Sequence, residues 1–213
     1  MYTGIVQQSV EVNGLQKQPG LLTFSVRLPA PLLDELQVGA SVSIDGVCLT
    51  VTEQAGHDVT FDAIQETQDR TTLGELELGG QVNVERSAKS SAEIGGHEIS
   101  GHIDGTVRVV EVERFENNCI FTFEAPAPYM KYIFPKGFIA LNGCSLTVVD
   151  VDRTASTFTV HLIPETLRVT TFDEKSAGDR VNFEIERKTQ VIVDTVQEFL
   201  REQAREGLLV AQS

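Results

Sequence analysis

GVCLTV at residues 46–51 and GCSLTV at residues 143–148 are two versions of one hexapeptide, separated by 97 positions. Other segments of the first half match the second half in the same order, at an offset of 97 that becomes 99 after two inserted residues: TGIV (3–6) with SGHI (100–103), LPAP (28–31) with APAP (125–128), ET (66–67) with ET (165–166), TT (71–72) with TT (170–171), and VNVE (82–85) with VNFE (181–184). Ordered matches of this kind indicate an internal duplication, in which each copy spans roughly 95 residues.

Each copy contains short stretches of alternating apolar and polar residues, separated by Gly-rich or Pro-rich turns. This pattern predicts strands. The predicted strands are 5–6, 22–28, 41–44, 48–51, 59–63 and 81–85 in the first copy, and 106–110, 120–123, 138–141, 145–148, 158–162 and 180–184 in the second. Six closely spaced strands per copy favour an all-β fold of two small closed barrels. One helical interruption is predicted, at residues 31–36, and the two inserted residues are assigned to a longer turn at 152–156.

A different periodicity follows the second copy. Apolar residues recur at three-residue and four-residue steps, which predicts an amphipathic helix from about Gln190 to Glu206 that ends at Gly207. The apolar positions are Val191, Ile192, Val196, Phe199 and Leu200. Because this stripe belongs to neither barrel, we expect it to pack against other copies of the chain. The predicted domains are 1–87, a linker at 88–96, 97–187, and a helix with a tail at 188–213.

Composition narrows the range of partners and settings. The 31 acidic and 17 basic residues give a net charge of −14, which disfavours binding to nucleic acid or to an anionic membrane. Three cysteines without CxxC spacing argue against a disulfide framework and a zinc site. With no basic leader and no long apolar run, we expect a soluble, cytoplasmic protein.

Cys48 and Ser145 occupy the same position of the repeated hexapeptide. Thr50 and Thr147 follow two residues later, so each pair shares one face of its strand. From the residues alone, a small buried side chain on a strand is the better explanation of Cys48. His97 and His102 lie in a Gly-rich loop with no third ligand nearby, so no metal site is predicted, and loop histidines are often surface residues.

The chain resembles the bacterial-type riboflavin synthases over nearly its whole length. The motifs that carry the resemblance are MYTGIV (1–6), GVCLTV (46–51), EIGGHEISGHIDG (93–105), KGFIALNGCSLTV (136–148), HLIPETLRVTT (161–171) and the paired VNVE and VNFE. The resemblance implies Greek-key barrels, a homotrimer held by the C-terminal helices, and no metal or organic cofactor. It also implies a reaction: one molecule of 6,7-dimethyl-8-ribityllumazine passes a four-carbon unit to a second, which yields riboflavin and 5-amino-6-ribitylamino-pyrimidinedione. The site would lie between the first barrel of one subunit and the second barrel of its neighbour.

The resemblance also implies roles for individual residues. We expect Cys48 and Ser145 to polarise or add to the lumazines, and His102, with His97 secondary, to move the protons of the 7-methyl group. Glu186 stands where relatives often have Asp; it is either a catalytic carboxylate or a solvated acid before the helix. The expected substrate contacts are Gly4, Ile5, Val6, Ser41, Cys48, Leu49, Thr50, Asp62, Ala63, Ile64, Gln65, Glu66, Thr67, Gly101, His102, Ile103, Lys136, Ser145, Leu146, Thr147, His161, Leu162, Ile163, Pro164, Glu165 and Thr166.

An alternative within the same fold is an optical antenna related to the lumazine and yellow fluorescent proteins, which bind the chromophore without chemistry. Such proteins tend to lose site residues of the second barrel and the C-terminal helix, whereas this chain keeps both. Tyr2 stands where relatives usually have Phe. Association with lumazine synthase is left open by the sequence.

Overall fold

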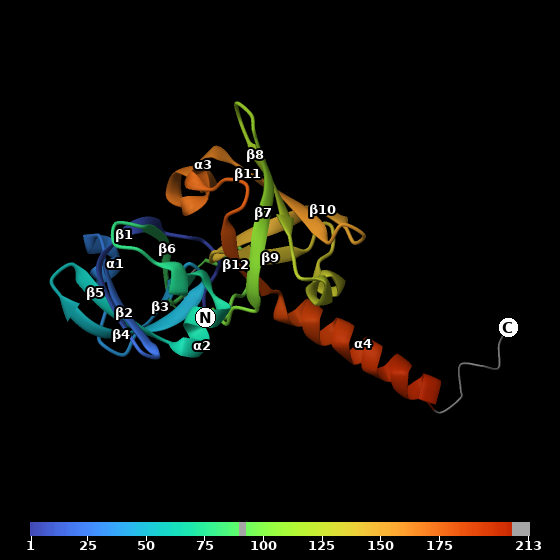
Figure 1. Ribbon diagram of the computed structural model, residues 1–213, viewed down its shortest axis with the longest axis horizontal. Helices are drawn as coiled ribbons and strands as arrows, with labels where there is room; N and C mark the ends of the chain where they lie inside the picture. Colours follow the sequence, from blue (N-terminus) through green and yellow to red (C-terminus); the bar gives the residue numbers. More distant parts are fainter. Residues whose placement is uncertain (90–92, 206–213) are drawn as a thin grey trace.

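Two closed, six-stranded antiparallel barrels lie side by side in the computed structural model, which describes residues 1–89 and 93–205, and a long helix leaves the second barrel (Figure 1). The predicted fold class is confirmed. The first barrel closes in the order β1-β2-β5-β4-β3-β6. Its strands are β1 (Gln8–Gln18), β2 (Leu21–Arg27), β3 (Ser41–Ile44), β4 (Val47–Ala55), β5 (Asp58–Ile64) and β6 (Gln81–Arg86).

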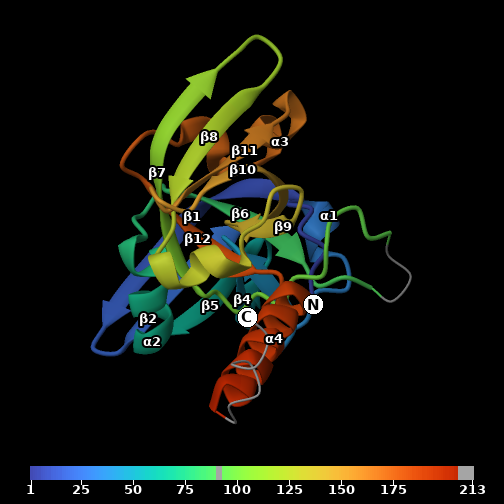
Figure 2. The same ribbon diagram turned by 90° about the vertical axis from the view of Figure 1, so that its right-hand side faces the viewer.

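The second barrel repeats the first strand for strand. It closes in the equivalent order, β7-β8-β11-β10-β9-β12, and β-bulges follow Val12, Val51, Val109 and Val148, which are repeat mates in two pairs. Its strands are β7 (Gly105–Arg114), β8 (Cys119–Glu124), β9 (Phe138–Leu141), β10 (Cys144–Asp152), β11 (Thr157–Leu162) and β12 (Arg180–Ile185). The β7–β8 hairpin extends well beyond the rest of this barrel (Figure 2).

Two local predictions were wrong. Residues 5–6 form no strand, and the first strand begins at Gln8. Within the barrels, a helix was predicted only at 31–36, where α1 (Ala30–Leu33) lies, but both barrels contain further short helices. These are α2 (Gln65–Arg70), η1 (Thr72–Glu75), η2 (Ala127–Tyr132), α3 (Pro164–Val169) and η3 (Thr171–Glu174). Elements of one or two turns contain too few residues to show a helical period in the sequence.

Alternation along the strands separates the barrel cores from the outer surface. Leu49 and Leu146 are 6% and 7% exposed and belong to the two cores, whereas Thr50 and Thr147 are exposed. Because successive side chains on a strand point to opposite faces, Cys48 and Ser145 lie on the outer face with the threonines. The chemistry predicted for these residues would therefore take place on the outside of each barrel.

The barrels meet through reciprocal contacts between repeat mates. Asn83 Nδ2 donates to Asn142 O at 3.0 Å, and Asn182 Nδ2 donates to Asp45 O at 2.9 Å. Between these contacts, the turns at Gly46 and Gly143 approach so closely that a Cβ on Gly46 would lie 2.7 Å from Gly143 N. Both glycines have positive φ, so the repeated Gly of the hexapeptide is required by this contact. The reciprocity gives the molecule approximate two-fold symmetry.

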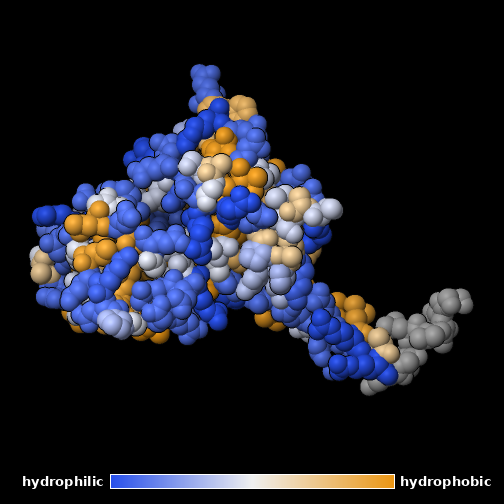
Figure 3. All heavy atoms as spheres, viewed as in Figure 1, coloured by the Kyte–Doolittle hydropathy of each residue, from blue (hydrophilic) through white to orange (hydrophobic). Residues whose placement is uncertain are grey.

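The C-terminal helix α4 (Arg187–Arg205) begins three residues before its predicted start, and the predicted end at Gly207 lies outside the described residues. Asp194 Oδ1 accepts hydrogen bonds from Lys131 Nζ and the Tyr132 hydroxyl, both at 2.7 Å, which holds α4 against η2. Five of its apolar residues are exposed: Val191, Ile192, Val196, Phe199 and Leu200. Figure 3 shows hydrophobic atoms along one edge of the helix. Within residues 1–89 and 93–205, no helix is long and apolar enough to cross a bilayer.

Candidate active site

The candidate site is built from two chain segments that precede the barrels, residues 2–6 and 97–103. They pair with each other through an isolated antiparallel bridge between the repeat mates Tyr2 and Ile99. Tyr2 N donates to Ile99 O at 2.8 Å, and Ile99 N donates to Tyr2 O at 3.0 Å. The two segments therefore cross at the junction between the barrels.

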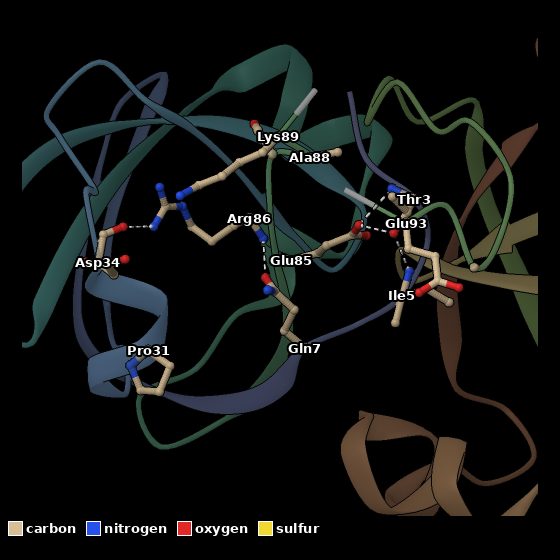
Figure 4. Close-up of a pocket in the computed structure, with 12 residues that line it drawn as sticks. Thr3, Ile5, Gln7, Pro31, Asp34, Glu85, Arg86, Ala88, Lys89 and Glu93 are labelled. Carbon is tan, nitrogen blue, oxygen red and sulfur yellow. Dashed lines mark hydrogen bonds between the residues drawn. The ribbon is translucent and has the colours of Figure 1, made fainter. Parts of the chain in front are cut away.

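A buried glutamate anchors each segment to its own barrel. Glu85 accepts hydrogen bonds from Thr3 N at 2.7 Å and Thr3 Oγ1 at 2.8 Å (Figure 4), and from Gly4 N at 3.0 Å. Glu184 accepts the same three bonds from Ser100 and Gly101. Burial raises the pKa of Glu85, and the three donors oppose that rise. The glutamates of the repeated VNVE and VNFE motifs therefore fix the positions of the two crossing segments.

Each segment then reaches across to the other barrel. Gly4 O accepts from Ser145 N at 2.8 Å, and Gly101 O accepts from Cys48 N at 2.9 Å. Both glycines have positive φ, and a Cβ on Gly101 would lie 2.6 Å from Cys48 Cβ. Val6 is buried in the core of the second barrel. The surface around Ser145 therefore combines the second barrel with the segment that precedes the first barrel. The surface around Cys48 combines the first barrel with the segment that precedes the second.

A cavity of about 650 Å³ opens beside this crossing. Four of the five predicted catalytic residues line its wall: Cys48, His97, His102 and Glu186. The fifth, Ser145, is bonded to His97, whose Nδ1 lies 2.6 Å from Ser145 Oγ. The tertiary structure brings all five predicted catalytic residues to one region.

His97 is held rigidly and is only 7% exposed. Its ring stacks on Phe138, with centroids 5.2 Å apart and an interplanar angle of 16°. Burial lowers the pKa of His97, and the nearby Glu186 carboxylate opposes that shift. A neutral imidazole with a protonated Nε2 can accept the Ser145 hydroxyl proton at Nδ1, so the pair is suited to polarising the serine oxygen.

His102 differs from His97 because its side chain is exposed. It lines the 650 Å³ cavity and also a neighbouring cavity of about 290 Å³. Its backbone is fixed at both ends: His102 N donates to Ser100 Oγ at 3.2 Å, and His102 O accepts from Arg187 Nη2 at 2.7 Å. An exposed imidazole on a fixed backbone can exchange protons with a bound molecule and with water.

Glu186 stands at the start of α4. Its carbonyl oxygen accepts from Gln190 N at 3.0 Å, and its carboxylate accepts from the Thr189 hydroxyl at 2.5 Å. Both bonds are local and support the first turn of the helix. Glu186 also lines the cavity that His97 lines, so its position is compatible both with a catalytic carboxylate and with an acid that precedes the helix.

The 290 Å³ cavity belongs to the first barrel. It combines Cys48 with Glu66 and Thr67 of α2 and with Gly101, His102 and Ile103 of the crossing segment. Equivalent residues meet at the second barrel: Ser145 of β10 lies beside Gly4 of the other crossing segment, which also carries Ile5, and α3 carries Glu165 and Thr166. Ile64 and its repeat mate Ile163 are 58% and 61% exposed, which leaves an apolar side chain beside each surface.

The remaining predicted contacts divide by the direction of their side chains. Leu49, Ala63, Leu146 and Leu162 are buried in the barrels, so only their backbone can face a ligand. Ser41 pairs with Thr50 across β3 and β4 and therefore lies next to the first surface. The others have exposed side chains at the strand ends and turns: Asp62, Gln65, Lys136, His161 and Pro164.

Several residues at the cavities were missed by the sequence analysis. Phe138 is the repeat mate of Ser41, so applying the offset to Ser41 would have found it. Arg70 and Arg187 also line the cavities, and no motif or repeat in the sequence indicated that they would. A third cavity of about 610 Å³, which Thr3, Ile5, Glu85 and Arg86 help to line, contains none of the five predicted catalytic residues (Figure 4).

The twin barrels and the duplicated surface define a protein of two tandem repeats, and comparisons with known proteins identify the repeat. The model of the lumazine binding domain matches twice, at residues 3–87 and 100–186. Riboflavin synthase of Escherichia coli strain K12 is 49% identical, covering 98% of this chain and 97% of the relative; the synthase of Chlamydia pneumoniae is 42% identical, covering 94% and 97%. The chain belongs to the riboflavin synthase family.

Solved structures show the same fold. LumP complexed with riboflavin superposes with a TM-score of 0.82 at 24% identity, covering 87% of this chain and all of that one. LumP complexed with 6,7-dimethyl-8-(1'-D-ribityl) lumazine gives a TM-score of 0.79. The similarity covers the twin barrels at a sequence identity that establishes architecture alone.

Proposed function

We propose that this chain is a riboflavin synthase. It converts two molecules of 6,7-dimethyl-8-ribityllumazine into riboflavin and 5-amino-6-ribitylamino-pyrimidinedione by transferring a four-carbon unit from one molecule to the other. The observation that carries the proposal is the duplicated surface, in which Cys48 and Ser145 take the same place beside Gly101 and Gly4. A reaction between two copies of one heterocycle needs two related binding surfaces. Holding the reactants in the reacting pose can contribute roughly 7–11 kcal/mol to catalysis.

Individual residues take distinct roles in the proposal. Thr50 and Thr147 hydrogen-bond the two heterocycles from the outer strand faces. Cys48 and Ser145 polarise them, and His97 accepts the hydroxyl proton of Ser145. His102, whose imidazole is exposed at both cavities, transfers the protons of the 7-methyl group. Glu186 orients the groups around His97 from the helix start.

We further infer a homotrimer that works in the cytoplasm. The exposed apolar stripe of α4 supports self-association, because a large unpartnered apolar helix face is unfavourable in water. The stripe would hold the subunits so that the first barrel of one chain meets the second barrel of the next. Cys48, Cys119 and Cys144 are all free thiols, as expected in a reducing compartment.

The decisive experiment is incubation of the purified chain with 6,7-dimethyl-8-ribityllumazine. We expect riboflavin absorbance and fluorescence to appear, with two lumazines consumed for each riboflavin and with an equal amount of the pyrimidinedione. If the lumazine instead binds and keeps its own spectrum, the chain is an antenna protein and the proposed activity is wrong.

A further inference from the structure

A buried phenol contacts the thiol that faces the cavity. The Tyr2 hydroxyl donates a hydrogen bond to Cys48 Sγ at a distance of 3.2 Å. Tyr2 is 1% exposed, and Cys48 is half-buried at the wall of both the 650 Å³ and the 290 Å³ cavity. The sulfur is therefore accessible on one side and bonded to a donor on the other.

The surroundings of Tyr2 hold its hydroxyl in place. The backbone of Tyr2 makes both hydrogen bonds of the bridge to Ile99. The ring packs with Ile99 and Ala140 in a small apolar cluster that Cys48 borders. Gly101 closes the other side, where a Cβ would lie 3.0 Å from Tyr2 Cε2. A ring fixed in this way aims its O–H at the sulfur at little further entropic cost.

The two repeats use different aromatic side chains to hydrogen-bond the equivalent residues Ser145 and Cys48. Ser145 is bonded by the imidazole of His97, whereas its repeat mate Cys48 is bonded by the phenol of Tyr2. The repeat mate of Tyr2 is Ile99, which has no side-chain donor. Each nucleophile-type side chain thus has one buried partner, and these partners do not correspond by sequence. The twin surfaces therefore differ in the group that bonds the equivalent side chain.

We propose that Tyr2 is the positioning residue of Cys48, and that its hydroxyl sets the direction and reactivity of the thiol in the first-barrel surface. This inference rests on the proposed function for its catalytic meaning. Burial, reinforced by the adjacent Cys48, raises the pKa of Tyr2 well above its usual range, so the phenol remains a donor and gives up no proton. A fixed donor favours the thiolate form of sulfur over the thiol.

Alkylation of Cys48 by iodoacetamide tests the proposal without the lumazine. The rate is measured from pH 6 to pH 10 in the full-length wild type, in Tyr2→Phe and in Tyr129→Phe. The other two cysteines are buried, and burial raises the pKa of Cys144 to about 12, so the native chain reacts at Cys48. Cys48→Ser measures the background. Tyr129→Phe is the matched control, because its hydroxyl bonds to Asp104 O rather than to a thiol.

We expect Tyr2→Phe to lower the alkylation rate of Cys48 about threefold, because the attacking sulfur loses the one hydrogen bond that stabilises its charge and fixes its direction. Tyr129→Phe keeps the wild-type profile. Identical profiles for the wild type and Tyr2→Phe overturn the proposal, and so does an equal loss of rate in Tyr129→Phe.

Turnover separates this inference from the proposed function. Tyr2→Phe is expected to lower kcat with little change in KM, and to have no further effect in a Cys48→Ala background, which removes the acceptor of the Tyr2 hydrogen bond. Equal losses in both backgrounds overturn the positioning role. A wild type that forms no riboflavin rejects the proposed function, and the alkylation profiles still decide the relationship between Tyr2 and Cys48.

Discussion

His97 Nδ1 and Ser145 Oγ lie 2.6 Å apart, although 48 residues separate them in the chain. The imidazole comes from the segment that leads into the second barrel, and the hydroxyl comes from the outer face of β10. Stacking on Phe138 and burial keep the ring in one orientation. The serine oxygen therefore has a fixed acceptor on one side, which makes this pair the most defined polar contact at the cavity.

Replacing His97 by Gln is expected to lower kcat by about 10²-fold, since a positioned proton acceptor contributes effects of that size. His57→Gln is the control, because His57 is an exposed turn residue of the first barrel whose Nδ1 contacts Leu28 O. Steady-state kinetics with the lumazine measures both variants. Equal rates for the wild type and His97→Gln would contradict the role of the pair.

The same substitution predicts a pH effect on stability. Burial lowers the pKa of folded His97 below that of the unfolded chain, about 6.5. As the pH falls below 6.5, the unfolded state binds a proton that the folded state resists, so the contribution of His97 to stability declines. Urea unfolding of the wild type and His97→Gln should show a free-energy difference that shrinks between pH 6.5 and pH 5. A difference that grows over this range would reverse the assignment.

Gly101→Ala is expected to destabilise the chain by about 3 kcal/mol or more. The new Cβ would lie 2.6 Å from Cys48 Cβ, and φ is +80°. Gly56→Ala separates the two causes, because Gly56 also has positive φ but no neighbour within 4 Å. This control should cost only about 1–2 kcal/mol. Urea unfolding measures both, and equal losses would mean that close packing at the crossing is unimportant.

Asp45→Asn is expected to stabilise the chain at pH 7. Burial raises the pKa of Asp45 to about 6, so above this pH the folded state carries a carboxylate in unfavourable surroundings. Because folded Asp45 binds a proton more readily than unfolded Asp45, its contribution to stability falls as the pH rises from about 4 to 6. The gain from Asn is at most about 3 kcal/mol at pH 7 and disappears below pH 4.

The repeat provides a mirror control for Asp45. Asn142 is its repeat mate, and the Oδ1 atoms of Asp45 and Asn142 accept equivalent bonds at 2.8 Å from Asn83 N and Asn182 N. Asn142→Asp should therefore destabilise at pH 7. Thermal unfolding at pH 4 and pH 7 compares the two variants. A stabilising effect of Asn142→Asp at pH 7 would refute the burial argument.

Val196→Glu is expected to dissociate the assembly. Val196 is 51% exposed on the apolar stripe of α4, and a charge buried there at a subunit contact would be unfavourable. Arg205→Glu, a larger charge change at an exposed position on the opposite side of α4, should leave the assembly intact. Size-exclusion chromatography with light scattering reports the mass, and turnover should fall with dissociation. If the wild type is itself monomeric, the proposed homotrimer is wrong.

Local patterns were sufficient to predict much of the fold. The alternation around Cys48 and Thr50 is a property of neighbouring residues, so the sequence alone predicts β4 and its outward face. The short helix α2 shows no such pattern, because its six residues are dominated by polar side chains. Ile5 and Val6 resembled a strand, yet neither pairs with a strand. The segment is held by the bonds of Thr3 and Gly4 to Glu85, by the bond from Ser145 N to Gly4 O, and by the burial of Val6 in the second core.

The sequence by itself determined that the chain contains two copies of one barrel and that Cys48 and Ser145 are equivalent. Both conclusions follow from patterns in the order of the residues, namely the fixed offset between the copies and the alternation along each strand. Only the tertiary structure decided which groups meet. Gly101 contacts Cys48, Gly4 contacts Ser145, and two unlike rings bond the two side chains. These contacts join residues about 50 to 140 positions apart, and hydrogen bonds between distant residues form only when the closed barrels bring the crossing segments together.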